Sequence, residues 1–375
     1  MTRWSSQLYI KEGRSKDVPR DILRDAARTA ELLISPDLPP VFTLRHIAHL
    51  TGVPYNFLRE VVSRSSDPYR VFKLKKNSPN LVGRYRYICA PHPKLLKVQR
   101  WINREILESL QPHEASYAYT KGAGVLKAAE VHSGCRWMIK LDVTNFFESI
   151  LEPRIYKIFR GLGYQPLVSL ELARLCTRVR PYGNPVYRNK QDANLPGLPY
   201  MVAEIGHLPQ GAATSPLLSN LAVYELDKEL SSYSIEHELT YSRYADDMVF
   251  SSEAKFSRSA VLVMVHELYD IVRKHGLWPN RVKTKIVSPG ARKVVLGLLV
   301  DGKKPRLTSE YKQEVRTHLH FLLREDIGVE KHLVKRGFDS RFGLRNFLLG
   351  KIAYAQHIEP KWAGEMRNML HLVKW

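Results

Sequence analysis

Cysteine is scarce in this chain. Cys89, Cys135 and Cys176 are the three among 375 residues, and an odd, scattered set fits free thiols in a reducing compartment better than a disulfide framework. Cys89 and His92 could begin a zinc site, but no second pair of ligands follows at zinc-finger spacing. A metal other than Mg²⁺ is therefore not expected.

Long apolar runs are also missing. No run approaches the roughly 20 residues that a membrane-spanning helix needs. Residues 1–6 (Met-Thr-Arg-Trp-Ser-Ser) lack the apolar stretch of a secretory signal peptide. Together these absences predict a cytoplasmic protein with no membrane partner.

Acidic residues are in the minority. Asp and Glu total 37 against 58 Lys and Arg, which gives a formal net charge of +21 and a pI near 9.8. Such a surplus favours a polyanionic partner, because each neutralised phosphate releases counterions. A merely basic soluble protein or a binder of membrane surfaces would share this composition. The length allows more than one domain, at roughly 100–200 residues each.

Three aspartates lie where short strands are predicted to end. Tyr244–Asp247 (Tyr-Ala-Asp-Asp) separates two β-rich runs, 238–243 and 248–252, and its turn-forming acids predict a β-hairpin with both at the tip. Asp142 closes the apolar run Trp137–Val143, which predicts a buried strand. Carboxylates at neighbouring strand ends can hold two Mg²⁺ ions, which stabilise the attacking and leaving oxygens of a phosphoryl displacement. An isolated Asp-Asp pair is more commonly a solvated turn, and nucleases also use carboxylate clusters, so the rest of the chain must decide.

Five blocks, in order, resemble those of reverse transcriptases. They cover about residues 70–300, and chance does not readily place five blocks in one order. The blocks are Lys75-Lys76 with Arg84–Ile88, Leu141–Ile150, Leu208–Gly211 followed by Ser215-Pro216, Tyr244–Asp247, and Asn280–Thr284. The resemblance implies an RNA-directed DNA polymerase, whereas a nuclease would not need the Leu-Pro-Gln-Gly block.

Two further segments resemble the retron class of these enzymes. Retrons carry Asn-Ala-x-x-His after a flexible loop, and this chain has Ala128–His132 (Ala-Ala-Glu-Val-His) after the loop Ser116–Gly124. Retrons commonly show Val-Thr-Gly where this chain has Val295-Leu296-Gly297. Both departures weaken the retron assignment and leave the polymerase assignment intact. His132 would bind template RNA by this resemblance, or serve as a core or capping histidine.

The resemblance also implies the residues of the active site. Asp142 and Asp246 would bind both Mg²⁺ ions, the Val143 carbonyl would complete one coordination shell, and Asp247 would support the pair. The residues expected to bind the nucleotide are Lys76 (or Lys75), Arg86, Phe147, Gln210, Gly211 and Lys283. Arg86 suits the triphosphate because a guanidinium can bind phosphate bidentately, although it and the lysines could be ordinary exposed strand residues.

Each of the other implied positions has a defined task. Phe147 would stack under the sugar and exclude a 2′-hydroxyl, with Phe146 in the core. Gln210 and Gly211 would let the backbone approach the nascent base pair. Lys283 would protonate or shield the departing pyrophosphate.

The implied fold class is α+β, a right-hand polymerase with fingers, a palm of antiparallel sheet packed on helices, and an α-helical thumb. We expect a helical N-terminal region at 1–64, fingers with part of the palm at 65–140, palm at 141–305 and thumb at 306–375. An insertion around 177–207 contains Arg178, Arg180, Arg188 and Lys190. Basic residues beside aromatic ones make it a candidate contact for single strands, and a solvated loop is the alternative.

Apolar residues at helical spacing predict that the tail from Thr308 is helical. One stripe is Tyr311, Val315, Leu319 and Leu322, and a second is Phe342, Leu344, Phe347, Leu348 and Ile352. The basic residues expected to bind an RNA stem or duplex are Lys312, Arg316, Lys335, Arg336, Arg341 and Arg345.

The leading hypothesis is a bacterial retron reverse transcriptase. It would use dNTPs to copy a cognate structured noncoding RNA, which serves as template and primer, into a short RNA-linked single-stranded DNA. An effector protein in antiphage defence would be a further partner. The alternatives are another defence-associated or group II intron-like reverse transcriptase, and an RNA-binding protein on an inactive polymerase scaffold; the presence of all three aspartates argues against the last.

Overall fold

The computed structural model describes residues 5–34, 37–75, 85–179 and 205–375. The chain forms two compact units, each assembled from three separate segments. Unit 1 comprises residues 1–119, 143–228 and 271–278, and unit 2 comprises residues 120–142, 229–270 and 279–375. The chain passes from unit 2 to unit 1 between Asp142 and Val143, and the helices α11 (Tyr224–Glu236) and α12 (Arg258–Lys274) contribute to both units.

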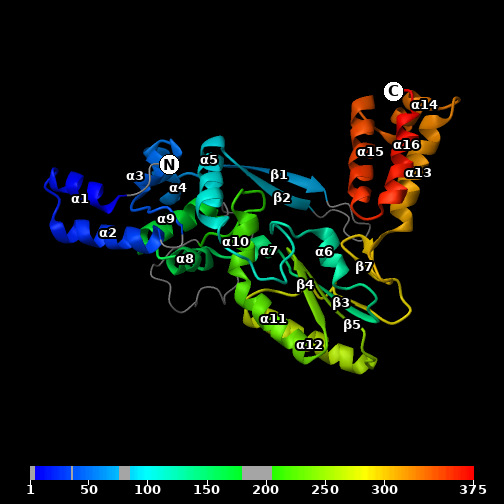
Figure 1. Ribbon diagram of the computed structural model, residues 1–375, viewed down its shortest axis with the longest axis horizontal. Helices are drawn as coiled ribbons and strands as arrows, with labels where there is room; N and C mark the ends of the chain where they lie inside the picture. The colour runs from blue at the N-terminus through cyan, green and yellow to red at the C-terminus, as the bar shows by residue number, and fades with distance from the viewer. Residues whose placement is uncertain (1–4, 35–36, 76–84, 180–204) are drawn as a thin grey trace. The chain divides into compact units, whose positions relative to one another are not determined.

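Unit 1 is mainly helical in its described residues and contains one two-stranded antiparallel sheet. Its strands β1 (Tyr69–Lys75) and β2 (Tyr85–Pro91) pair with Tyr69 opposite Pro91. The helices that lie wholly within it are α1 (Ser6–Arg14), α2 (Arg20–Ile34), α3 (Leu44–Thr51), α4 (Tyr55–Val62), α5 (Pro93–Ile102) continued by a π-helical turn (Asn103–Leu107), α7 (Phe146–Ser149), α8 (Glu152–Gly161), α9 (Pro166–Cys176) and α10 (Ser215–Ala222) (Figure 1).

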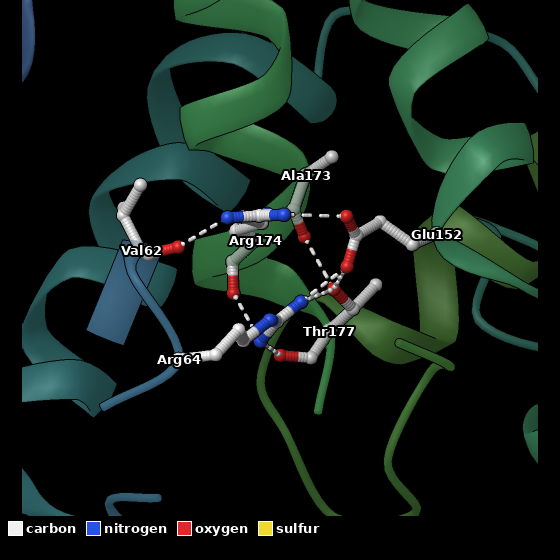
Figure 2. Close-up of polar contacts among 6 residues, drawn as sticks. All are labelled: Val62, Arg64, Glu152, Ala173, Arg174 and Thr177. Atoms are coloured by element: carbon white, nitrogen blue, oxygen red, sulfur yellow. Dashed lines mark hydrogen bonds and ion pairs between the residues drawn. The ribbon is translucent and has the colours of Figure 1, made fainter. Parts of the chain in front are cut away.

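A buried ionic cluster joins the ends of α4, α8 and α9 in unit 1 (Figure 2). Glu152, the first residue of α8, is 2% exposed and accepts hydrogen bonds from the guanidinium groups of Arg64 and Arg174. Arg64 also donates to Thr177 Oγ1 at 2.7 Å and to the Thr177 carbonyl at 2.8 Å. Arg174 donates to the Val62 carbonyl at 2.8 Å. One carboxylate therefore balances two guanidinium groups, and their remaining donors hold the ends of two other helices.

The central sheet of unit 2 has four antiparallel strands in the order β4-β5-β3-β6. The strands are β3 (Trp137–Asp142), β4 (Thr240–Tyr244), β5 (Asp247–Ser252) and β6 (Lys285–Val287). β3 pairs with β5 on one side and β6 on the other, with Asp142 opposite Asp247 and Ile139 opposite Ile286. The strand predicted at 137–143 and the hairpin predicted around residues 244–247 are both confirmed.

Alternation along the strands gives this sheet two different faces. One face carries Met138 and Val249, which belong to a core shared with the C-terminal helices. The other carries Ile139 and Phe250, which lie close to Val261 of α12 around a small cavity. Both faces are therefore covered by helices in unit 2, whereas the aspartates lie at one edge of the sheet.

The C-terminal part of unit 2 joins a small sheet to a helical bundle. The strands β7 (Val294–Val295), β8 (Leu298–Leu299) and β9 (Arg306–Leu307) form a three-stranded antiparallel sheet. The short helix α6 (Val125–Glu130) also belongs to this unit. The bundle consists of α13 (Ser309–Leu323), α14 (Gly328–Arg336), α15 (Arg341–Gln356) and α16 (Pro360–His371), which lie side by side (Figure 1).

The predicted helical tail is confirmed, with one exception among its apolar stripes. Val315, Leu319 and Leu348 are each 0% exposed within the bundle core. Phe342, a member of the second predicted stripe, is instead 72% exposed. Phe342 and Leu344 are two residues apart, so at about 100° per residue they lie on opposite faces of α15, and Leu344 is the one on the buried face. Among the described residues, no helix is both long enough and apolar enough to cross a membrane.

The ionic cluster yields a stability prediction. Glu152→Ala should lower the free energy of unfolding by about 3–5 kcal/mol, because it leaves two partly buried guanidinium groups without a counter-charge. Glu152→Gln should cost less, since the amide oxygen still accepts one hydrogen bond. Urea unfolding followed by circular dichroism measures the difference. The control is Glu105→Gln, which removes the charge from a more exposed ion pair with Arg104 and should change stability by less than about 1 kcal/mol. Equal losses in Glu152→Ala and the control would refute a stabilising role for the cluster.

Candidate active site

The strand register brings two of the three predicted acids together. Asp142 at the end of β3 is the cross-strand partner of Asp247 at the start of β5, and facing residues in an antiparallel pair have Cβ atoms roughly 5 Å apart. Tyr244 pairs with Asp247 across the hairpin, so Ala245 and Asp246 form a two-residue turn between β4 and β5. Asp142 is 7% exposed, Asp246 is half-buried and Asp247 is exposed. The three acids therefore occupy one edge of the sheet.

The turn that carries Asp246 is backbone-strained and supported from beneath. Ala245 has a φ of 56°, a left-handed conformation that costs a non-glycine residue on the order of 1 kcal/mol. Its carbonyl accepts a hydrogen bond from Nη1 of Arg243 at 3.2 Å. Arg243 is fully buried. Sequence reasoning missed this residue, because an arginine in a strand is usually an exposed one.

Carboxylate crowding shapes the electrostatics of this edge. The pKa of Asp247 is raised to about 6, first because surrounding atoms partly remove its carboxyl group from water and then because of the neighbouring charge of Asp246. Lys140 and Lys283 act in the opposite direction on that carboxyl. Asp142 Oδ1 accepts an ion-paired hydrogen bond from Lys283 Nζ at 2.7 Å. A cation bound here would relieve the same repulsion.

Lys140 is a second residue that the sequence did not single out. It lies two positions before Asp142 on the same face of β3, and burial lowers the pKa of its ammonium group. Its Nζ donates to the Val294 carbonyl of β7 at 3.2 Å. This bond ties β3 to the small sheet β7-β8-β9.

The donor chemistry of this edge fits Mg²⁺. All candidate ligands are oxygens, which Mg²⁺ prefers, and Mg²⁺ in polymerase sites is held by one or two carboxylates with water and substrate phosphates completing its octahedron. No group of three or more Asp, Glu, His or Cys residues in the described parts of the chain forms a ready-made metal cage.

The residues expected to bind the nucleotide lie in several places. Lys283 forms the ion pair with Asp142, whereas Arg86 is exposed on β2 with no ion-pair partner among the described residues. Phe146 is 3% exposed and Phe147 is half-buried, with its ring against that of Tyr119 at a centroid distance of 6.4 Å. Lys76 lies outside the described residues, as do Arg180, Arg188 and Lys190 of the predicted insertion.

Gln210 and Gly211, both predicted to lie near the nascent base pair, pack against strand β2. Gly211 has a φ of 116°, and a Cβ there would lie 3.0 Å from the Cys89 carbonyl oxygen. The Gln210 carbonyl accepts a hydrogen bond from the Cys89 amide at 2.8 Å. The close approach that needs glycine is thus to strand β2.

Arg178 is 7% exposed and binds Asp67 through Nε and Nη2, so in this structure it is a buried ion-pair residue.

His132 is buried in the sheet of the candidate site. It is 1% exposed, and its Nδ1 and Nε2 are each 2.6 Å from a serine hydroxyl, Ser251 of β5 and Ser242 of β4 respectively. Burial lowers the pKa of the imidazole to about 4. Both ring nitrogens are thus used in joining the two strands of the Asp246-Asp247 hairpin. A direct contact of this ring with RNA would require these bonds to break.

The basic residues of the C-terminal bundle divide into two groups. Lys312 is ion-paired with Glu359 and Arg341 with Glu330. The remaining four are exposed and have no carboxylate partner among the described residues: Arg316, Lys335, Arg336 and Arg345. This second group leaves its charge available to a polyanion.

Comparisons with known proteins agree with the site. A sequence model of the family described as "Reverse transcriptase (RNA-dependent DNA polymerase)" matches residues 74–322. The chain is 28% identical to the retron Ec86 reverse transcriptase of Escherichia coli over 76% of this chain and 79% of that protein. It is 30% identical to the retron Mx162 reverse transcriptase of Myxococcus xanthus over 64% of this chain and 51% of that protein.

Solved structures include a distant match to telomerase from Candida albicans in complex with a fragment of telomeric RNA. It has 13% identity and a TM-score of 0.42, and it covers 80% of this chain and 58% of that chain. A likeness this weak supports no argument.

The chain belongs to the reverse transcriptases, which are RNA-directed DNA polymerases. The predicted resemblance to retron enzymes is confirmed by the relatives that match. The predicted α+β fold, with an antiparallel palm sheet between helices and a helical thumb, is also confirmed. From here α13–α16 are called the thumb.

The buried histidine yields a pH prediction. An unfolded histidine titrates near pH 6.5, so between pH 6.5 and pH 4 the unfolded chain binds the extra proton and folding stability falls as the pH drops. Glutamine does not titrate. Over that pH range the free energy of unfolding of His132→Gln should therefore fall by up to about 3 kcal/mol less than that of the wild type. Urea unfolding at a series of pH values measures the difference.

His46, His318 and His332 also have lowered pKa values. The stability of the variant will therefore still depend on pH, and the measurement is the difference between its pH dependence and that of the wild type. His371→Gln, at an exposed position of α16, is the control and should follow the wild type. If His132→Gln instead weakened RNA binding and left the pH dependence unchanged, an RNA contact would replace the structural role.

Proposed function

We propose that the protein is a retron reverse transcriptase, which copies part of a cognate structured noncoding RNA into a short single-stranded DNA that remains linked to that RNA. The observation that carries the polymerase chemistry is the pairing of Asp142 with Asp247 beside the Asp246 turn. The retron assignment is supported by the names of the relatives that match. A role in antiphage defence with an effector protein, in the bacterial cytoplasm, follows from the same resemblance.

The acids at the sheet edge would hold the metal. Asp142 and Asp246 would bind two Mg²⁺ ions, the Val143 carbonyl would complete one shell, and Asp247 would support the pair. When bound, such ions activate the attacking hydroxyl and stabilise the leaving pyrophosphate oxygens. The raised pKa of Asp247 supports this assignment, because a site that crowds carboxylates favours a cation.

Other residues would position the deoxynucleotide. Arg86 presents an exposed guanidinium for the triphosphate, with Lys76 assisting. Phe147, rather than the buried Phe146, has the partly open ring needed to contact a sugar and disfavour a 2′-hydroxyl. Gln210 and Gly211 would support the nascent base pair. Lys283, near enough to Asp142 to pair with it, would shield or protonate the departing pyrophosphate.

The thumb would hold the RNA. The exposed cations Arg316, Lys335, Arg336 and Arg345 have no carboxylate partner in the described chain and so can neutralise phosphates at low cost. Lys312 and Arg341 would contribute only after their ion pairs with Glu359 and Glu330 open. We rank the first four residues above these two, and we assign His132 to the hairpin rather than to the RNA surface.

The catalytic assignment predicts a loss of synthesis without a loss of binding. Asp246→Asn should lower incorporation of dNTPs on a primed RNA template by a thousandfold or more, on the order expected when a metal-binding carboxylate is removed. Its affinity for the template should stay within about twofold, because the residues that we assign to RNA binding lie in the thumb. Asp339→Asn, at an exposed position between α14 and α15 and outside the sheet edge, controls for the change in charge. Normal incorporation by Asp246→Asn would exclude the assigned chemistry.

The retron assignment predicts a covalent RNA–DNA product. The protein is purified from its native host with its nucleic acid retained, and that nucleic acid is run on a denaturing gel after treatment with RNase or DNase. A short DNA whose mobility shifts once on RNase treatment, as expected for a covalent RNA stub, would support the proposal. RNA without DNA would instead favour a group II intron-like or another defence-associated reverse transcriptase.

A further inference from the structure

A second site of unit 2 lies at the opposite end of β3 from the aspartates. A cavity of about 660 Å³ is lined by Cys135 and Arg136, by the loop 289–293 between β6 and β7, and by Ser309 at the start of α13. Cys135 and Arg136 directly precede β3, whereas Asp142 ends it. Six residues of strand span about 20 Å. The cavity is therefore separate from the site of nucleotide addition.

The charge of the cavity is positive and only partly balanced. Its basic lining residues are Arg136, Arg292 and Lys293, and its acidic one is Asp301. Arg292 forms a bidentate pair with Glu310, at 2.6 Å for each bond. Asp301 is paired with Arg306 at 2.8 Å. Arg136 and Lys293 therefore remain without a carboxylate partner in the described part of the chain.

Lys293 is the more unusual of these two cations. It is 3% exposed, and its Nζ donates to two main-chain carbonyls, those of Ser288 at 3.3 Å and Ala291 at 3.1 Å. An ammonium group has three hydrogens, so these carbonyls leave one donor over. Burying a cation without a counter-charge is unfavourable, and an anion in the cavity would supply both the charge and the third acceptor.

Arg136 adds an exposed guanidinium group to the cavity lining. The residue is exposed, and a guanidinium fork matches the paired oxygens of a phosphate. Since the whole chain carries a net charge of +21, polyanions rather than isolated acidic side chains are the partners that its long-range field attracts.

We propose that this cavity binds a phosphate group of the nucleic acid backbone, at a point remote from catalysis. The site would anchor RNA or product DNA to the base of the thumb while the active site turns over. The proposal rests on the proposed function for the kind of nucleic acid involved. Its test uses synthetic nucleic acids, so it can fail or succeed independently of whether the protein makes an RNA-linked DNA.

Equilibrium binding of the full-length protein provides the first test. The affinity of wild type and Arg136→Ala for a labelled RNA hairpin and a labelled RNA–DNA hybrid is measured by fluorescence anisotropy at several salt concentrations. Arg136→Ala should weaken binding of at least one probe by about three- to tenfold and reduce the salt slope by about one, as expected for the loss of one phosphate contact. Thermal melting should be unchanged, since Arg136 is exposed.

The matched control is Arg258→Ala. Arg258 is exposed at the start of α12, which contributes no residue to the cavity lining. It carries the same charge, so it measures the general electrostatic effect of losing one arginine. Equal changes in affinity and salt slope for the two variants would overturn the proposal.

Cys135 provides a local probe of occupancy. Its thiol lines the cavity and is 6% exposed, and its modification by a small thiol reagent can be followed by peptide mass spectrometry. The RNA hairpin or the hybrid should slow this reaction severalfold in the wild type and much less in Arg136→Ala. Comparing the two probes tells RNA from hybrid as the source of the phosphate.

Inorganic phosphate and pyrophosphate form separate arms of the labelling experiment. If either of these anions slows the modification of Cys135 while the hairpin and the hybrid do not, the ligand of the cavity is a free phosphate and not the nucleic acid backbone. That result would overturn the proposal. Lack of protection by every probe would do the same where Cys135 reacts. Where the thiol reacts too slowly to follow, the anisotropy comparison decides alone.

Discussion

The register between β3 and β5 is the constraint on which the rest of unit 2 depends. It places Asp142 opposite Asp247 and, on the same face, Met138 opposite Ser251. Because side chains alternate along a strand, a slip of one residue would turn the acids to the other face and remove Met138 from the thumb core. The hydrophobic contacts of Met138 and Val249 with the thumb residues therefore stabilise the same pairing that assembles the carboxylates. Packing and chemistry select one register.

That register brings Asp142, Asp246 and Asp247 close enough for their negative charges to repel one another. The structure offsets part of this repulsion with Lys140 and Lys283, whose charges oppose the rise in the Asp247 pKa. Each lysine also has a second connection. Lys140 reaches the carbonyl of Val294 in the small sheet, and Lys283 pairs directly with Asp142. The carboxylates, the two lysines and the small sheet at the base of the thumb are therefore linked by hydrogen bonds and charge interactions. A change in any of them should alter the position or the pKa of the carboxylates.

Local patterns in the sequence predicted much of this architecture. The turn-forming acids at 246–247 predicted the hairpin, the apolar run before Asp142 predicted β3, and helical periodicity predicted the thumb. The site residues that rest on family resemblance, such as Arg86 and Phe147, remain predictions.

Several side-chain environments could not be predicted from the sequence, because they depend on contacts with residues far away in the chain. Arg243 supports the Ala245 turn from a fully buried position, and nothing in its neighbours marks it as buried. His132 finds its two serines only once β4 and β5 are paired. Glu152 becomes the centre of an ionic cluster because helices from separate segments meet there. Phe342 is apolar, but it lies two residues from the buried Leu344 and therefore on the opposite, solvent-facing side of α15.

The interleaving of the two units has a consequence for how the chain folds during synthesis. β3 emerges early from the ribosome, yet its partners β5 and β6 and the thumb helices that cover its face come much later. Domains made of continuous sequence can fold as they emerge, whereas long-range strand pairing must wait and folds slowly. The apolar residues of β3 therefore stay uncovered through most of translation. Newly made protein should depend on chaperones, and truncation within the thumb should leave the whole palm sheet unable to mature.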